Sequence, residues 1–170
     1  MQLQSSLKNE YVILEALKDS DFEDLYKVAS DSLIWEQHPT KNRYQRDVFQ
    51  NYFEGAILSK GAFLVRDAKT LAIIGCTRYY DLNKETKTIT IGYTFLARSH
   101  WGGIYNSSMK KLMIDYAFQF VNKILFHIGA NNIRSQTAIQ RIGAKKITEK
   151  TIAYHGEQSN LNFIYCIEKK

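Results

Sequence analysis

Seven segments of the chain have the alternating or apolar pattern that is typical of β-strands. They span residues 11–17, 62–66, 71–81, 87–97, 123–129, 145–154 and 160–167. Polar turns around residues 67–70 and 82–86 connect three of them into a predicted antiparallel meander. The segment 87–97 places its larger apolar side chains on one expected face, namely Ile89, Ile91, Tyr93 and Phe95. The pattern therefore predicts a sheet as the centre of the fold.

Apolar residues at i, i+3, i+4 and i+7 predict helices between these strands. The first follows Ser20, which has the spacing of a capping box with Glu23, and the second spans about 43–59. The third starts after a glycine pair, and the fourth begins near Asn132. The predicted buried stripe of the third helix is Met109, Leu112, Met113, Tyr116, Ala117 and Phe120.

Length and composition indicate one folded domain over residues 1–170, with its core at about 11–167. Hydrophobic residues make up 45% of the 170, and no apolar run approaches the roughly 20 residues of a membrane span. The first residues lack the features of a signal peptide, so we expect a cytoplasmic protein without a membrane partner. Cys76 and Cys166 lie in apolar strand patterns with no metal-binding spacing. We expect both to be reduced, and no metal to be bound.

The net charge of +6 is compatible with an acidic ligand, with nucleic acid or simply with a solvated surface. The lysines are scattered, and basic and aromatic residues are not interleaved as in nucleic-acid-binding proteins. Nucleic acid is therefore an unlikely partner. A modest positive field would favour a ligand with several phosphate groups.

The stretch from Ile91 to Phe118 combines a strand, a short glycine loop and a long helix. A helix N-terminus offers unpaired N–H groups and partial positive charge, and glycine lets the backbone approach a ligand closely. Gly102 and Gly103 therefore indicate a phosphate or pyrophosphate site. The alternative is a tight strand-to-helix connection that needs glycine for conformation alone.

This loop resembles the acetyl-CoA loop of the GCN5-related N-acetyltransferase (GNAT) superfamily, and most closely the branch that includes ribosomal-protein N-terminal acetyltransferases. Trp101, Gly102 and Tyr105 match the aromatic-Trp-Gly-x-Gly-Tyr pattern of that branch, whereas Ile104 occupies the place of the second glycine. A second match follows at the predicted fourth helix, which starts with Asn-x-x-Ser at residues 132–135 and ends at Gly143.

The resemblance implies an α+β fold with a largely antiparallel central sheet of about six to seven strands and helices on both faces. A splayed strand pair would hold the pantetheine arm of the cofactor. The implied activity is acetyl-CoA-dependent transfer of an acetyl group to a primary amine, either a protein N-terminus or a small molecule. A non-catalytic acyl-CoA sensor of the same fold is the alternative, and the chain would be a monomer or a homodimer.

The resemblance also assigns cofactor contacts. The backbone of Phe95, Leu96 and Ala97 would meet pantetheine, and the amides of residues 101–106 would hold the pyrophosphate. Arg98 or His100 would add positive charge there or lie on the surface, and Asn132 would bind pantetheine or cap its helix. The implied cofactor set is Phe95, Leu96, Ala97, Arg98, Trp101, Gly102, Gly103, Ile104, Tyr105, Asn106, Asn132 and Ser135.

Catalysis would need an acid for the leaving thiolate and a proton acceptor for the amine. Many relatives carry a Tyr in the fourth helix, but that place holds Ile139. Ser135 matches the early Ser of the ribosomal-protein branch and is the expected thiolate partner. The base stays open among Glu36, Asp81, Glu85, His100 and Tyr93. The expected acceptor contacts are Trp35, Glu36, Tyr79 and Tyr93, and the aromatic members could instead be packing residues.

Overall fold

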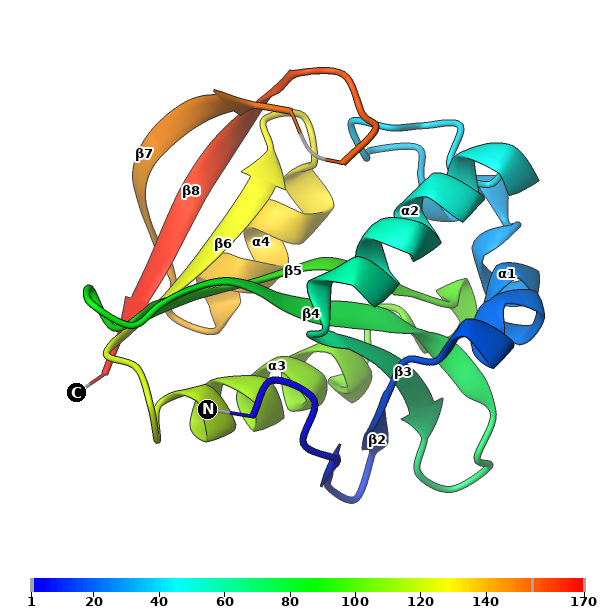
Figure 1. Cartoon of the computed structure of the whole chain (residues 1–170), viewed down its shortest axis with the longest axis horizontal. Coiled ribbons are helices and arrows are strands. Elements are labelled where there is room, and N and C mark those ends of the chain that lie inside the picture. The colour runs from blue at the N-terminus through cyan, green and yellow to red at the C-terminus, as the bar shows by residue number, and fades with distance from the viewer. Residues whose placement is uncertain (1, 154, 170) are drawn as a thin grey trace.

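The computed structural model describes residues 2–153 and 155–169, which form one eight-stranded sheet (Figure 1). Its order is β1-β2-β3-β4-β5-β6-β8-β7. The strands are β1 (Leu7–Lys8), β2 (Val12–Ala16), β3 (Ala62–Asp67), β4 (Ile73–Asn83), β5 (Thr88–Leu96), β6 (Lys123–Gly129), β7 (Lys145–Ile152) and β8 (Asn160–Glu168). The sequence pattern missed the two-residue β1, and the predicted end of the seventh segment, Tyr154, lies outside the described residues. Only the pair of β5 and β6 is parallel within the described sheet, so the expected largely antiparallel sheet is confirmed.

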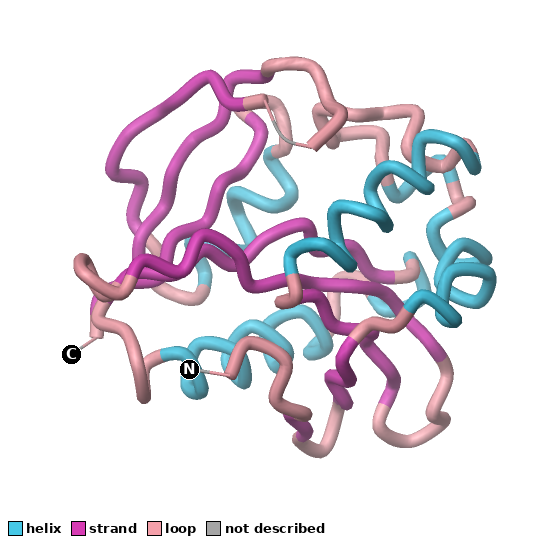
Figure 2. The backbone as a smooth tube through the Cα atoms, viewed as in Figure 1, coloured by secondary structure: helices cyan, strands magenta, loops and turns pink. Residues whose placement is uncertain are grey.

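Helices cover both faces of the sheet, as expected. Figure 2 shows α1 (Phe22–Ala29) and α2 (Arg46–Ser59) on one face and α3 (Ile104–Ala117) on the other. The fourth helix, α4 (Ile133–Arg141), shares the core of α3, because Ile139 belongs to the same buried cluster as Met109 and Met113. None of the described helices combines the length and apolar character needed to cross a membrane.

The predicted capping box at α1 is wrong. The chain enters α1 through a 3-10 turn at Asp19–Asp21, and the Lys18 amide donates to Asp21 Oδ2 at 2.8 Å. Glu23 forms an ion pair with Arg46 of α2 instead. The acidic residue that closes the turn therefore lies two positions earlier than the pattern indicated.

The parallel pairing of β5 and β6 is short, and the two strands then separate. Thr88–Thr90 pair with Lys123–Leu125, and no further pairs between these strands are formed in the described chain. On its other side, β6 pairs with β8 along its whole length. Figure 1 shows β6, β8 and β7 turning away from β4 and β5. The sheet thus opens between the second halves of β5 and β6.

A β-bulge in β5 lies where the strands separate. Arg78 of β4 pairs with Gly92, but Cys76 pairs with Phe95, so β5 has one extra residue in this interval. Tyr93 accommodates it with a φ of 52°, in the left-handed region, and the Tyr52 hydroxyl donates to the Tyr93 carbonyl at 2.6 Å. The register shift therefore places the bulge directly after Gly92.

The bulge also corrects the predicted faces of β5. Ile89 and Ile91 pack in the core beneath α3, whereas Phe95 packs in the other core, beneath α1 and α2. Because side chains alternate strictly in an unbroken strand, one inserted residue moves every later side chain to the opposite face. The expectation that Ile89, Ile91 and Phe95 share one face was therefore wrong.

Candidate active site

One pocket of about 660 Å³ occupies the opening between β5 and β6. Its walls come from both separated strands, from the loop before α3, and from α3 and α4. Among the residues expected at a site, those that line the pocket are Tyr93, Phe95, Leu96, His100, Trp101, Gly102, Gly103, Asn106, Asn132 and Ser135. Those outside its lining are Trp35, Glu36, Tyr79, Asp81, Glu85, Ala97, Arg98, Ile104 and Tyr105. Two distant sequence motifs thus meet in a single cavity.

The glycine loop forms an open cradle at the start of α3. Gly102 has a φ of 70°, and a Cβ added to Gly102 or Gly103 would meet no atom within 4 Å. The first turn of α3 has no acidic residue and no side-chain cap, so its N–H groups and positive dipole end stay available. Ile104 begins the helix with its side chain 47% exposed. These features fit a diphosphate group.

Asp67, at the end of β3, anchors this loop from outside the pocket. Tyr105 donates to its carboxylate at 2.7 Å, and His100 Nε2 lies 3.4 Å from the same oxygen. The amides of Lys69 and Thr70 donate to the other oxygen. The Tyr105 hydroxyl, followed by these two amides, holds the pKa of Asp67 well below its usual range. Asp67 therefore joins the β3–β4 turn to the loop.

Replacing Asp67 by Asn should loosen this anchor and weaken acetyl-CoA binding several-fold. Because the folded-state pKa is depressed, the ionised carboxylate contributes stability above its unfolded pKa of about 3.9, and that stability is lost as the pH falls. Urea unfolding at pH 7 and pH 3.5 should show a smaller acid-induced loss of stability in Asp67→Asn than in wild type. Glu85→Gln, in the exposed β4–β5 turn, is the control; equal acid-induced losses in all three proteins would contradict the role of Asp67.

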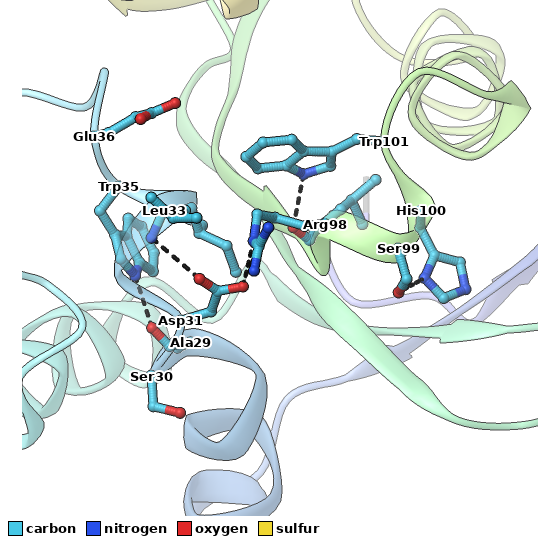
Figure 3. Close-up of polar contacts among 12 residues, drawn as sticks. Ala29, Ser30, Asp31, Leu33, Trp35, Glu36, Arg98, Ser99, His100 and Trp101 are labelled. Carbon is cyan, nitrogen blue, oxygen red and sulfur yellow. Dashed lines mark hydrogen bonds and ion pairs between the residues drawn. The ribbon is translucent and has the colours of Figure 1, made fainter.

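Trp101 and Arg134 join the loop to α4 at one side of the pocket. The Trp101 indole donates to the Leu96 carbonyl at 2.9 Å (Figure 3). The Arg134 guanidinium lies 4.0 Å from the centre of the Trp101 ring and forms an ion pair with Glu36 at 3.3 Å. This contact fixes the position of the Trp101 ring against the separated strand.

Arg98 and Ala97 are committed to contacts within the protein. Arg98 Nε donates to Asp31 Oδ2 at 2.5 Å, as Figure 3 shows. The Ala97 amide donates to the Ile74 carbonyl at 2.7 Å, and its carbonyl accepts from the His100 amide. Both residues therefore stabilise the loop through contacts outside the pocket. His100 is the basic residue of this turn that lines the pocket.

Asn132 and Ser135 lie together at the start of α4. The Asn132 side chain is 3% exposed, and its Oδ1 accepts from the Ser135 amide at 3.1 Å, which caps the helix. Ser135 is partly buried and faces the pocket. Ile139, one turn further along α4, is 4% exposed and forms part of the same wall. Ser135 thus offers a hydroxyl group to the pocket where Ile139 offers none.

The candidate acceptor residues lie in different surroundings. Trp35 is fully buried and its indole donates to the Ala29 carbonyl at 2.7 Å (Figure 3). Tyr79 is fully buried and donates to the Met113 carbonyl at 2.5 Å. Glu36 is exposed and paired with Arg134. Tyr93 lines the main pocket and also a neighbouring pocket of about 580 Å³, and His127 is shared by the same two pockets.

The sequence analysis did not single out Lys110, which also lines the main pocket. Its side chain is 4% exposed, and Nζ donates to Thr94 Oγ1 at 2.6 Å. Burial lowers the pKa of Lys110 to about 7. A charged residue within an apolar helical stripe was the available signal, since Lys110 follows Met109 and precedes Met113 at i+3.

The depressed pKa of Lys110 predicts how the stability of the ligand-free protein depends on pH. Between pH 7 and pH 9 the unfolded chain keeps the Lys110 proton and the folded chain releases it, so this residue makes stability rise with pH. Its contribution approaches about 1.4 kcal/mol per pH unit. Urea unfolding at both pH values should show the rise in wild type and a smaller one in Lys110→Met. A constant stability difference between the two proteins would contradict this prediction.

Residues 12–145 match the family model described as an acetyltransferase (GNAT) domain. No curated protein sequence matches the chain significantly. Many solved structures share the fold. A GNAT-family acetyltransferase from Bacillus anthracis is 18% identical, with a TM-score of 0.76, and the match covers 96% of this chain and 98% of that one.

Two further similar structures belong to acetyltransferases whose names state a substrate or a role. The ribosomal-protein-S5-alanine acetyltransferase from Vibrio fischeri is 16% identical over 97% of each chain, with a TM-score of 0.70. The Microcin C7 self-immunity acetyltransferase MccE, solved with acetyl-CoA and AMP, is 13% identical over 95% of this chain and 94% of its own, with a TM-score of 0.76. At these identities the likeness concerns the fold, whereas the family model spans most of the sequence. The chain therefore belongs to the GNAT acetyltransferase family, whose members use acetyl-CoA.

Proposed function

We propose that this protein transfers the acetyl group of acetyl-CoA directly to a primary amine, either the N-terminus of a protein or a small amine. The observation that carries the proposal is the shared pocket. The backbone of β5 beyond its bulge, the open N-terminus of α3 and the hydroxyl-bearing start of α4 all line it. These are the parts that binding a thioester cofactor and protonating its sulfur would require.

The two ends of the pocket would bind different parts of the cofactor. The amides of residues 102–106 would hold the diphosphate, and the strand residues Phe95 and Leu96 would bind the pantetheine arm through their backbone. The Leu96 carbonyl already accepts from Trp101, so its amide is the group left for that arm. Asn132 would cap α4 and bind pantetheine at once.

When bound, acetyl-CoA supplies an acetyl group already activated as a thioester. A backbone N–H of β5 near the bulge would polarise the carbonyl. The left-handed conformation of Tyr93 interrupts the pairing with β4, so the backbone around it is not fully used by the sheet. Ser135 would donate a proton to the sulfur as the amine attacks.

The acceptor amine is proposed to approach from the neighbouring pocket. Tyr93 and His127 line both cavities, so they mark the boundary at which an acceptor could meet the cofactor. Burial lowers the pKa of His127, and Asp81, which lines that second pocket, partly opposes this shift. Asp81 was one of the open candidates for the base, and its position beside His127 favours it as part of a proton path.

Acetyl transfer to a panel of amines tests this proposal. The panel should contain short peptides with free N-termini, the same peptides with blocked N-termini, a polyamine, free amino acids and an aminoglycoside. We expect release of CoA together with one acetylated product, identified by mass spectrometry. Tight binding of acetyl-CoA without transfer to any amine would instead favour a non-catalytic acyl-CoA sensor, a function with which the apolar Ile139 wall is compatible.

A further inference from the structure

Lys110 and Lys111 are adjacent in α3, yet their surroundings differ completely. The side chain of Lys111 is 75% exposed and forms an ion pair with Asp115, one turn later. Lys110 is 4% exposed and points into the main pocket. Lysine is almost never fully buried unless it is paired, so the position of Lys110 calls for a functional explanation.

The helix places Lys110 on the face that carries the cofactor cradle. Gly103, Ser107 and Lys110 follow each other at i, i+4 and i+7, and all three line the pocket. Helical side chains lean toward the N-terminus of their helix. The amine itself bonds to Thr94 of β5, and the flexible stem of Lys110 can turn it toward the first turn of α3, where the free amides lie.

The amine has no carboxylate partner among the residues that the structure describes. Its hydrogen bond to Thr94 Oγ1 continues to Thr77 Oγ1 at 2.8 Å, and both partners are neutral. Within the described chain, Glu157 is the one carboxylate in the pocket lining, and it forms an ion pair with Arg43. An unpaired buried ammonium group costs free energy.

The remaining charged and titratable groups around the pocket do not supply a counter-ion. His100 lies before α3, and Arg134 and Arg141 belong to α4. His38 and His127 line other parts of the wall, from the segment before α2 and from β6. All of these groups are neutral or positive. Among the described residues, therefore, none places a negative charge beside the amine of Lys110.

We infer that Lys110 is a cofactor-binding residue that forms an ion pair with the diphosphate of CoA, in addition to the backbone amides of the glycine loop. The inference rests on the cofactor placement in the proposed function. The positive side chain that binds the diphosphate is then Lys110 of α3 and not Arg98, which forms an ion pair with Asp31. The Thr94 hydroxyl keeps the amine in the pocket before the cofactor arrives.

The ion pair predicts that the protein takes up a proton when it binds CoA. With a pKa of about 7 in the free protein, Lys110 is only about one-tenth protonated at pH 8. A neighbouring diphosphate raises this pKa and restores the charge. Uptake should therefore approach about 0.9 proton at pH 8, and it should shrink toward pH 6, where the free protein already holds the proton.

Calorimetric titration with CoA at pH 8, in buffers of different ionisation enthalpy, measures this uptake directly. The variant is Lys110→Met, which keeps the length of the side chain and suits a buried position. Lys111→Met is the matched control, and pantetheine is the probe that lacks the diphosphate. We expect Lys110→Met to lose the proton uptake and to bind CoA roughly 10- to 100-fold more weakly. Its affinity for pantetheine should stay within about twofold of wild type, and Lys111→Met should behave as wild type.

The outcomes separate this inference from the proposed function. If wild type binds CoA but Lys110→Met shows the same affinity and the same proton uptake, the role of Lys110 is wrong and the cofactor site stands. If Lys110→Met weakens CoA and pantetheine equally, Lys110 is a packing residue of the pocket and not a diphosphate ligand. If folded wild type fails to bind CoA, the cofactor placement itself fails, and the inference fails with it.

Discussion

Replacing Gly102 by Asp is expected to weaken acetyl-CoA binding roughly 100-fold or more, which is about 2.7 kcal/mol. The new carboxylate would face the phosphates at the N-terminus of α3, where the site offers partial positive charge. A Cβ at Gly102 has open space around it, so the side chain fits and its charge decides the effect. Affinity would be measured by calorimetric titration, after circular dichroism has shown that the variant is folded.

The matched control is Gly102→Asn. Asn has the shape of Asp without its charge, and both tolerate the left-handed conformation that Gly102 adopts at a φ of 70°. Backbone strain should therefore affect the two variants alike, and only Asp should lose most of the affinity. Equal losses in both would attribute the effect to strain, and unchanged affinity in folded Gly102→Asp would place the diphosphate elsewhere.

Replacing Ser135 by Ala is expected to lower kcat about 100-fold while acetyl-CoA affinity changes less than about threefold. A positioned acid contributes roughly 10²- to 10⁴-fold to such a reaction. The cap of α4 would survive, because Asn132 accepts from the backbone amide of residue 135 and not from its hydroxyl. Steady-state kinetics with the best acceptor, combined with a binding titration, separates turnover from affinity.

Gln140→Ala provides the control for Ser135→Ala. Gln140 lies on the exposed side of the same helix and outside the pocket lining, so its loss should leave kcat unchanged. If Ser135→Ala also turns over at the wild-type rate, its hydroxyl is a helix-terminus or packing group. Another residue or a water molecule would then protonate the thiolate.

Much of the architecture was predictable because hydrophobic periodicity follows burial directly. The four helices, the meander of β3, β4 and β5 and the loop before α3 appear where the pattern places them, with ends shifted by a few residues. The family motifs at Trp101–Tyr105 and Asn132–Ser135 were also visible, because each is a short run of residues within one segment of the chain. Their convergence on one pocket needed the three-dimensional structure.

The parts that the sequence could not reveal depend on contacts between distant residues. An extra residue in β5 changes which face Phe95 occupies, and periodicity alone cannot detect it, since the residue is inserted without breaking the apolar alternation. Asp67 gains its role only through Tyr105 and His100, far along the chain. Lysine is a residue type usually assigned to solvent, and the contact of Lys110 with Thr94 of β5 becomes visible only in the structure.

A crystal structure of the protein with CoA tests the central claim most directly, namely that the opening between β5 and β6 is the cofactor site. We expect the diphosphate at the amides of residues 102–106 and the pantetheine arm against Phe95 and Leu96, with its sulfur facing Ser135. A diphosphate bound elsewhere, or a pantetheine arm outside the gap between the two strands, would contradict the assignment.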